Sequence, residues 1–392
     1  MRCIAVLPLL VACGSASVPA EEAAPSAPAV AASPAPSSEA AAAAASPAAG
    51  SATEKPVGPI AGVKPVEGDV VLRDFRFASG QTLGELRMHY MTLGTLRRDR
   101  RGRAANAVLI MHGTTGSGRQ FTREQFTSEL FGPGQPLDLG RMYVILPDDI
   151  GHGHSSKPSD GLRARFPAYG YRDMVAAEHE LVKRLGVDHL LLVMGTSMGC
   201  MHSWMWAETW PSMMDAVMPL ACLPTQIAGR NREWRKMIID AIREDPDWRG
   251  GEYTEQPRAA LGVAAVLLTL AGSAPLADQA HMPTRDAADE WLAAHRREPI
   301  DANDLLYAIA SSSDYDPSRD LEKITAPVMF VNSADDFINP PELGVAEREV
   351  KRVAKGRFVL IPASDATHGH GTHTWAVFWK KYLVELLAAT GR

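Results

Sequence analysis

The stretch that decides the fold reads Leu190-Leu-Leu-Val-Met194, followed by Gly195-Thr-Ser-Met-Gly199. Its first part is uniformly apolar, as expected of a strand that is covered on both faces of a sheet. Its second part has the pattern Gly-x-Ser-x-Gly, and a helical pattern follows over residues 201–208. Between a strand and a helix, this pattern forms a sharp turn that presents the serine hydroxyl above the sheet. The sequence therefore predicts Ser197 as a nucleophile, with an ordinary tight turn as the alternative.

Similar apolar runs recur along the chain and indicate an α/β architecture. They are short, turn residues follow most of them, and helical patterns such as 174–185 and 343–353 lie between them. This alternation predicts a mostly parallel sheet flanked by helices. No strand pattern occurs between about residues 223 and 314, so we expect a helical cap over the carboxyl edge of the sheet there, or else an ordinary helical subdomain. The other apolar runs are residues 107–111, 143–146, 216–220, 328–331 and 358–361.

Two later loops contain the partners that a nucleophilic serine needs. The serine requires a base, and the base requires a carboxylate that orients it, here in the chain order Ser, Asp, His. Asp335 and Asp336 follow a predicted strand, and we choose Asp336 because of its spacing to the following proline. His368, His370 and His373 precede the last predicted helix, over residues 375–387, and we choose His370 because glycines flank it on both sides. The other two histidines are expected at the surface or in supporting hydrogen bonds.

The loop after the strand 107–111 is the candidate oxyanion hole. It reads His112-Gly-Thr-Thr-Gly116, and its backbone N–H at Thr114, together with that of Met198 after the nucleophile, would stabilise a developing negative charge. His112 is expected to brace this loop instead of reacting. A competing interpretation is a metal site, because histidine is the commonest metal ligand. That site would use His152, His154, His368, His370 and His373, but it would leave the serine motif unexplained, so we expect no cofactor and no metal.

Composition restricts the class of protein. The 392 residues are 46% hydrophobic with a net charge of −6, which excludes a collagen, a fully disordered chain and a polytopic membrane protein and argues against a nucleic-acid partner. Beyond Cys3 and Cys13, only Cys200 and Cys222 remain, so a disulfide framework is excluded. We expect these two cysteines to be buried as small apolar side chains, although one bridge between them is possible.

The first residues predict export. Met1-Arg2 and the short apolar run that follows have the form of a signal peptide over residues 1–12, too short to span a membrane. They end in Leu10-Val-Ala-Cys13, which resembles a bacterial lipobox, so Cys13 is the expected lipidation site and the membrane anchor. Residues 13–66 are rich in Ala, Pro and Ser and are predicted to be a disordered tether before the folded domain at 67–392. The predicted location is the bacterial cell envelope, lipid-anchored or periplasmic; a plain secretory signal or a wrong start codon is the alternative.

Together these motifs resemble the homoserine O-acetyltransferase branch of the α/β-hydrolase superfamily. The likeness covers residues 106–109 with the His112 loop, residues 173–175 with 185–186, the segment 195–201, the pairs 241–242 and 245–246, residues 251–253, Asp336, and the pair Gly369-His370. The resemblance implies an α/β-hydrolase fold, permits a homodimer, and implies that the serine carries an acyl group from acyl-CoA to a hydroxyl beneath a helical cap.

Three departures from that family favour hydrolysis as the first hypothesis. Gly371 stands where an Asp typically follows the catalytic His, Ile239 stands where an Arg is expected, and Cys200 replaces a Gly. The missing Asp and Arg would bind an amino acid acceptor, and an exported enzyme would lack acyl-CoA. We therefore expect an exported serine hydrolase of a small-molecule carboxylic ester, with acyl transfer as the enzymatic alternative and a catalytically silent binding protein as the third.

Overall fold

The computed structural model describes residues 57–294 and 300–391. Their eight strands form one sheet in the order β1-β2-β4-β3-β5-β6-β7-β8. The pairs β1–β2 and β2–β4 are antiparallel, and every other neighbouring pair is parallel. The predicted α/β fold is therefore confirmed. The strands are β1 (Val66–Arg76), β2 (Thr82–Gly94), β3 (Ala107–Met111), β4 (Tyr143–Pro147), β5 (Leu192–Thr196), β6 (Val217–Leu220), β7 (Val328–Ser333) and β8 (Gly356–Ile361).

Helices cover both faces of this sheet, and alternate strand residues explain why. Along β3, Val108 and Ile110 point into one apolar cluster, whereas Leu109 and Met111 point into another. The first cluster also contains residues of α1 (Glu124–Leu130) and α10 (Lys380–Ala389). The second contains residues of α2 (Tyr171–Arg184), α3 (Met198–Thr209) and α9 (Val345–Glu349). The central strands are apolar throughout because neither of their faces meets water.

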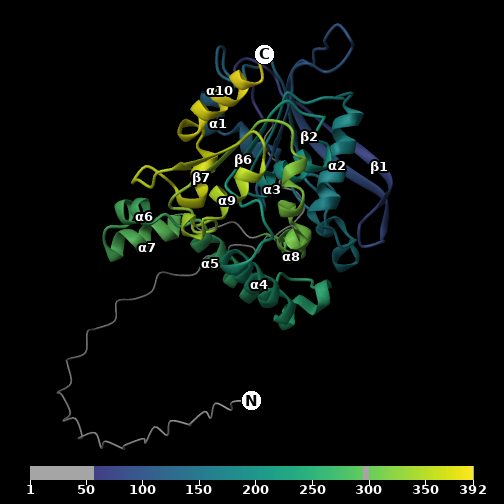
Figure 1. Cartoon of the computed structure of the whole chain (residues 1–392). Coiled ribbons are helices and arrows are strands. Elements are labelled where there is room, and N and C mark those ends of the chain that lie inside the picture. The colour runs from purple at the N-terminus through teal and green to yellow at the C-terminus, as the bar shows by residue number, and fades with distance from the viewer. Residues whose placement is uncertain (1–56, 295–299, 392) are drawn as a thin grey trace, which may run out of the picture. The chain divides into compact units, whose positions relative to one another are not determined.

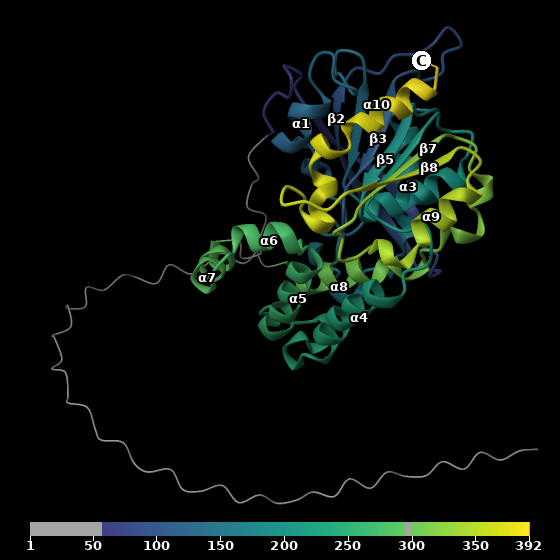
Figure 2. The same cartoon turned by 60° about the vertical axis from the view of Figure 1, so that its left-hand side comes forward.

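The remaining helices are inserted between β6 and β7. They are α4 (Gly229–Glu244), α5 (Arg258–Ala271), α6 (Pro275–His281), α7 (Arg285–Ala294) and α8 (Ala302–Ala310). Figures 1 and 2 show α4, α5 and α8 together at one end of the sheet. These three helices share a third apolar cluster, which also includes Ile338 from the loop after β7. The insertion therefore packs against a loop that carries one of the predicted site residues.

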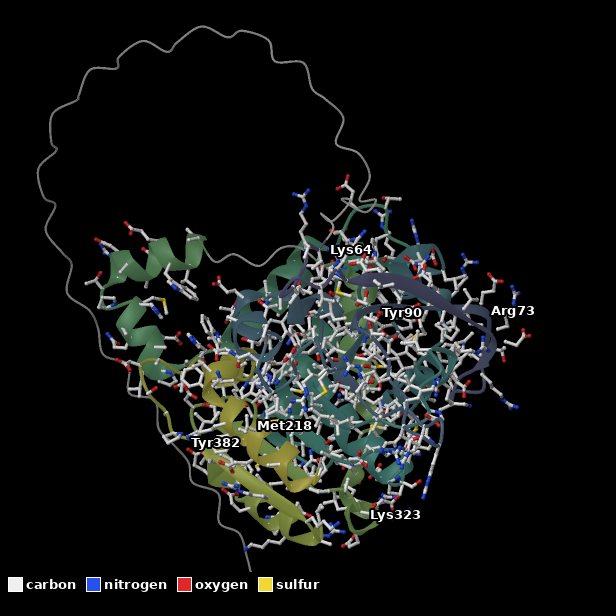
Figure 3. All side chains as sticks on the ribbon, turned by 90° about the horizontal axis from the view of Figure 1, so that it is seen from above. Lys64, Arg73, Tyr90, Met218, Lys323 and Tyr382 are labelled. Atoms are coloured by element: carbon white, nitrogen blue, oxygen red, sulfur yellow. A yellow bond between two sulfur atoms is a disulfide. The ribbon has the colours of Figure 1, made fainter. Side chains whose placement is uncertain are left out.

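Exposed charged side chains and buried apolar side chains occupy different places in the fold. In Figure 3, Arg73 and Lys323 project outward, whereas Met218 of β6 lies among packed side chains and is fully buried. Among the described residues, no single helix combines the length and the hydropathy needed to cross a bilayer. The consecutive helices α5 and α6 meet those criteria only together, and they are bent by 106° at their junction.

Several boundaries differ from the expectation. The sequence did not predict β1 and β2 as separate strands, because most β1 side chains are exposed and form no apolar run. The last helix begins at Lys380, and not at residue 375, because short 3₁₀ turns precede it. The predicted tether ends too late, since Ile60 is buried in the core and is paired with Val63. The predicted signal peptide, the rest of the tether and Cys13 lie outside the described residues.

Candidate active site

Ser197 occupies the sharp turn between β5 and α3. Its backbone has φ 56° and ψ −106°, a conformation that L-residues rarely adopt. Both glycines of the motif are needed for this geometry. A Cβ on Gly195 would overlap the carbonyl oxygen of Gly199, and a Cβ on Gly199 would overlap that of Met111. The sharp turn, or elbow, that Gly-x-Ser-x-Gly predicts is therefore present. It requires glycine at positions 195 and 199, because the strand, the turn and the helix lie too close together there for a Cβ atom.

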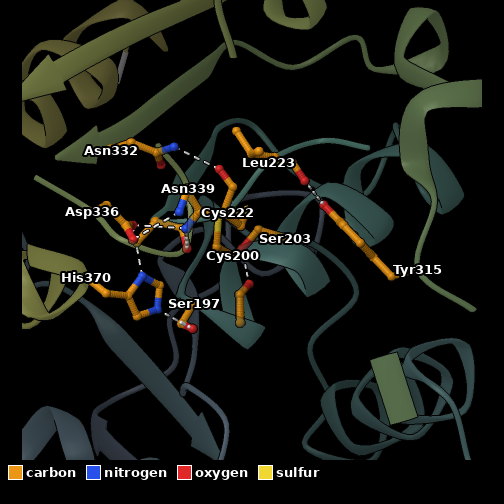
Figure 4. The surroundings of a disulfide bond; sticks show 12 residues. Ser197, Cys200, Ser203, Cys222, Leu223, Tyr315, Asn332, Asp336, Asn339 and His370 are labelled. Atoms are coloured by element: carbon orange, nitrogen blue, oxygen red, sulfur yellow. Dashed lines mark hydrogen bonds and ion pairs between the residues drawn. A yellow bond between two sulfur atoms is a disulfide. The ribbon is translucent and has the colours of Figure 1, made fainter. Parts of the chain in front are cut away.

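The structure brings Ser197 together with both residues chosen from the later loops. His370 Nε2 lies 2.8 Å from Ser197 Oγ, and His370 Nδ1 lies 2.9 Å from Asp336 Oδ2. Figure 4 shows the three side chains in a line. The Ser197 hydroxyl can donate to Nε2 while Nδ1–H donates to the Asp336 carboxylate. This is the arrangement in which an imidazole can remove the serine proton. We call these three residues the candidate triad.

Asp336 is held as a carboxylate by its surroundings. Its Oδ1 accepts hydrogen bonds from the backbone N–H of Ile338 at 2.8 Å and of Asn339 at 3.1 Å, and its Oδ2 accepts one from Asn339 Nδ2 at 2.9 Å. Burial opposes the charge, but His370 and these hydrogen bonds outweigh it, so the pKa of Asp336 lies below its usual value. The group can therefore stabilise an imidazolium on His370.

Asp335, the alternative acid, has a different position. Its Oδ2 accepts a hydrogen bond from Thr367 Oγ1 at 2.7 Å and one from the backbone N–H of Gly369 at 3.1 Å. It thus holds the loop that carries His370 and does not contact the imidazole. The two adjacent acids therefore have different roles. Asp336 accepts a hydrogen bond from His370, and Asp335 fixes the backbone of the loop that carries His370.

Of the two neighbouring histidines, His373 supports His370, whereas His368 packs on Trp375. His373 Nδ1–H donates to the carbonyl oxygen of His370, and burial lowers the pKa of His373 to about 3, so its ring is neutral. His368 stacks on Trp375 with ring centroids 4.6 Å apart. Its pKa is lowered by burial as well. Both positions agree with the supporting and surface roles expected for them.

The loop after β3 is fixed by His112. His112 Nε2 accepts a hydrogen bond from the backbone N–H of Asp149 at 3.1 Å, so the proton is on Nδ1, which donates to Gly113 O at 2.8 Å. That oxygen also accepts from the backbone N–H of Gly116. In a trans peptide the N–H points opposite to the C=O, so the Thr114 N–H is turned away from these contacts. Neither it nor the Met198 N–H has a hydrogen-bond acceptor among the described residues, which suits an oxyanion hole.

Cys200 and Cys222 form a disulfide, so the expectation of two free thiols was wrong. Both residues are fully buried, as expected, and their Cα atoms are 5.8 Å apart. The two cysteines meet because the first turn of α3 packs beside the end of β6, a contact that apolar flanking residues do not reveal. Figure 4 shows the bridge beside the candidate triad. Asn332 Nδ2 donates to Cys222 O at 2.9 Å, which links the bridge to the end of β7.

The five histidines of the alternative metal site do not form one ligand set. In residues 57–294 and 300–391, the one group of three or more candidate ligands is Asp149, Glu178 and His202, all fully buried. Glu178 already accepts hydrogen bonds from His202 Nδ1 at 2.8 Å and Trp206 Nε1 at 2.6 Å. Burial raises the pKa of Glu178 to about 7, and burial and Glu178 raise that of Asp149 well above its usual value. Both acids therefore keep their protons to higher pH than exposed carboxyl groups do.

One residue of this region was missed by the sequence reasoning. Arg235 lies on the buried face of α4 and is only 2% exposed. The signal was present, because Arg235 falls on the same face as Ile238, Ile239 and Ile242, where a charged side chain is unusual. A cavity of about 610 Å³, lined mainly by apolar residues, lies beside the start of α4 and includes Met201 and Ile338 in its wall.

The fold and the elbow define the class of protein: an enzyme of the α/β-hydrolase superfamily. A model of the alpha/beta hydrolase fold family matches residues 106–364, and the chain belongs to that family. Within it, the chain belongs to the branch of the homoserine O-acetyltransferases. The homoserine O-acetyltransferase of Citrifermentans bemidjiense is 30% identical over 306 residues, which cover 68% of this chain and 82% of that protein.

Solved structures share the fold. A homoserine O-acetyltransferase from Bacillus anthracis has a TM-score of 0.71 and 22% identity, covering 82% of this chain and 97% of that one. The acetyl esterase MekB has a TM-score of 0.71 and 22% identity, covering 86% of this chain and 99% of that one. The same fold thus occurs in transferases and in hydrolases.

Proposed function

We propose that this protein is a serine-dependent acyltransferase that moves an acyl group from an activated donor to a hydroxyl compound. The observation that carries the proposal is the line of hydrogen bonds Ser197–His370–Asp336, formed in a chain whose relatives by sequence are homoserine O-acetyltransferases. Those relatives favour acyl transfer over hydrolysis, which the sequence departures had placed first.

The proposed mechanism has two halves. Ser197 Oγ attacks the acyl carbonyl while His370 Nε2 takes its proton, and the Thr114 and Met198 N–H groups stabilise the oxyanion. His370 then gives the proton to the leaving group, which departs and leaves an acyl-serine. In the second half an acceptor hydroxyl attacks this ester, His370 takes the acceptor's proton, and the same proton returns to Ser197 Oγ. Asp336 holds the imidazole in the required tautomer throughout.

Hydrolysis is the second candidate, and a specific feature favours it. If water replaces the acceptor in the second half, the same groups act as an esterase. Gly371 follows His370, where the resembling transferases have an Asp, and Ile239 stands where they have an Arg. Two groups expected to hold an amino acid acceptor are thus absent from their usual positions.

The test separates the two reactions by following the fate of the acyl group. Purified protein is given p-nitrophenyl acetate, and we expect a burst of nitrophenolate that marks the acyl-enzyme. It is then given acetyl-CoA with and without homoserine. Faster release of CoA with homoserine, together with formation of O-acetylhomoserine, supports transfer, whereas acetate as the sole product shows hydrolysis.

Two serine variants identify the nucleophile. Ser197→Ala should abolish both the burst and turnover. Ser203→Ala is the matched control, because Ser203 is a buried serine of α3, the helix that follows Ser197, and its Oγ donates to Gly199 O at 2.7 Å. A full burst in Ser197→Ala, or no burst in the parent with any activated ester, contradicts the proposal.

A further inference from the structure

The cavity beside the start of α4 has the size and the lining of a small-molecule site. Its volume is about 610 Å³. Sites for small ligands are typically clefts of about 300 to 1,000 Å³ that are mostly apolar and carry a few polar groups. Most residues in the wall of this cavity are apolar, and the two charged ones, Arg230 and Glu342, are exposed at the surface. An apolar interior with charges at its rim suits an apolar ligand.

The helix that follows the nucleophile supplies one wall of the cavity. The backbone N–H of Met201 donates to Ser197 O at 3.2 Å, so Met201 stands one turn after the nucleophile. Side chains of a helix lean toward its N-terminus, so the Met201 side chain covers the turn that carries Ser197. The apolar wall at Met201 is therefore adjacent to the nucleophile.

The acid loop and the end of β6 supply two further walls. Ile338 lines the cavity, and its backbone N–H donates to Asp336 Oδ1 at 2.8 Å. Leu223 also lines it and directly follows Cys222; Figure 4 shows Leu223 together with the candidate triad in the surroundings of the bridge. Residues that contact or neighbour two members of the triad thus border the cavity.

The walls of the cavity also indicate which half of an ester it can hold. The oxyanion of the reacting carbonyl faces the N–H groups of Thr114 and Met198, and the leaving group lies within reach of His370 Nε2. Among the described residues that line the cavity, none belongs to the His112 loop or to the loop that carries His370. The cavity therefore lies on the side that remains for the acyl chain.

We propose that this cavity binds the acyl chain of the substrate, and that this chain is apolar, uncharged and of medium length, such as octanoyl. Its burial would be favoured in proportion to the apolar area removed from water. The flexible thioether of Met201 can adapt to such a chain. The acetyl group in the names of the relatives has only a methyl group beyond its carbonyl and would leave the cavity empty. The inference rests on the proposed acyl-serine chemistry and adds the acyl group that the serine carries.

The experiment compares p-nitrophenyl butanoate with p-nitrophenyl octanoate on the full chain, below the concentration at which the octanoate ester aggregates. In both reactions Ser197 Oγ bonds to the acyl carbon, the bond from that carbon to the nitrophenyl oxygen breaks, and nitrophenolate is released. The leaving group and the atoms next to the carbonyl are the same, so a difference in rate reports the rest of the acyl chain.

We expect the second-order rate constant of the nitrophenolate burst to be about 10- to 100-fold larger for octanoate than for butanoate. Each added methylene that leaves water contributes up to about fourfold. Rate constants within about twofold of each other in the parent overturn the proposal, because the added methylenes would then remain in water.

Substitutions then assign the effect to the cavity. Ile227→Trp and Val345→Trp each enlarge a half-buried lining residue, from two different walls, and each should reduce the octanoate preference by about tenfold or more. Glu233→Trp is the control, because Glu233 is an exposed residue of α4 outside the cavity wall, and the preference should be unchanged.

A preference for octanoate that survives in both cavity variants overturns the proposal. The use of two walls keeps the test decisive if one variant does not fold. If the parent gives no burst with either ester, the acyl-serine chemistry fails instead, so the two failures are distinguishable.

Discussion

Removing the Cys200–Cys222 bridge should destabilise the folded domain by an amount that its loop length predicts. The perturbation is the double variant Cys200→Ala/Cys222→Ala, or reduction of the parent. The bridged residues are 22 positions apart, and closing a loop of that size removes about 11 cal/mol/K of entropy from the unfolded chain. At 25 °C this corresponds to about 3 kcal/mol of stability.

The bridge should also matter to the site, because it joins the first turn of α3 to the strand beside it. Met198, whose N–H is a candidate oxyanion donor, stands at the start of that helix. Ala221, next to Cys222, accepts a hydrogen bond from Asn339 Nδ2 at 3.2 Å, and Asn339 in turn binds Asp336. Opening the bridge therefore loosens the nucleophile and the acid together, and we expect kcat to fall more than KM rises.

The assay is urea unfolding followed by tryptophan fluorescence, since the chain has 8 tryptophans. With an m-value of about 3 kcal/mol per molar urea for the free energy of unfolding, the unfolding midpoint of the reduced parent should lie roughly 1 M urea below that of the oxidised parent. Reductant should have no effect on the double variant, which serves as the control. Thiol titration of the unfolded, unreduced and unprocessed chain should find two of its four cysteines free. Four free thiols, or the same midpoint with and without reductant, would refute the reasoning.

Three further outcomes follow from single contacts. Gly199→Ala forces a methyl group onto the Met111 carbonyl and should cost about 3 kcal/mol in thermal unfolding, whereas Gly262→Ala meets open space and should not destabilise. In the parent the stability that comes from the proton on Asp149 is complete below pH 3.8 and is lost as the pH rises through its raised folded-state pKa. Asp149→Asn should therefore flatten the fall in urea stability that sets in as the pH rises above 3.8, by up to about 1.4 kcal/mol per pH unit, and an unchanged slope would contradict the raised pKa of Asp149. Cys13→Ser should move the expressed protein from the detergent phase to the aqueous phase, and unchanged partitioning would disprove the lipid anchor.

The elbow and the central strands could be predicted because their signals are local. Gly195 is required by a contact with Gly199 in the same five-residue motif, and a strand buried on both faces must be apolar at every position. The boundary of β5 was less predictable: the strand runs from Leu192 to Thr196, because Gly195 and Thr196 pair with residues 219 and 220 although neither belongs to the apolar run. Backbone pairing therefore extends the strand past the end of the apolar run, which is the part that side chains reveal.

Contacts between distant segments could not be predicted in the same way. The meeting of Cys200 with Cys222 depends on how α3 packs beside β6, and the hydrogen bond of Arg235 to Ser312 depends on how α4 packs against the turn after α8. Asp336 and His370 were found only because chain order and turn residues narrow the choice to a few candidates. Where no such rule exists, a residue such as Arg235 can be recognised as unusual from helical spacing, but its partners follow only from the tertiary structure.

The bridge also bears on the choice between transfer and hydrolysis. Disulfides persist in oxidising compartments and are rare in the reducing cytosol, which is where acyl-CoA is available. If the bridge forms in cells, it agrees with the export that Cys13 predicts, and an acyltransferase in that compartment must take its acyl group from an ester other than acyl-CoA. If the bridge is reduced in cells, the argument for hydrolysis from location disappears, and only Gly371 and Ile239 still favour it. The thiol state of Cys200 and Cys222 in cells therefore decides which donors are worth testing.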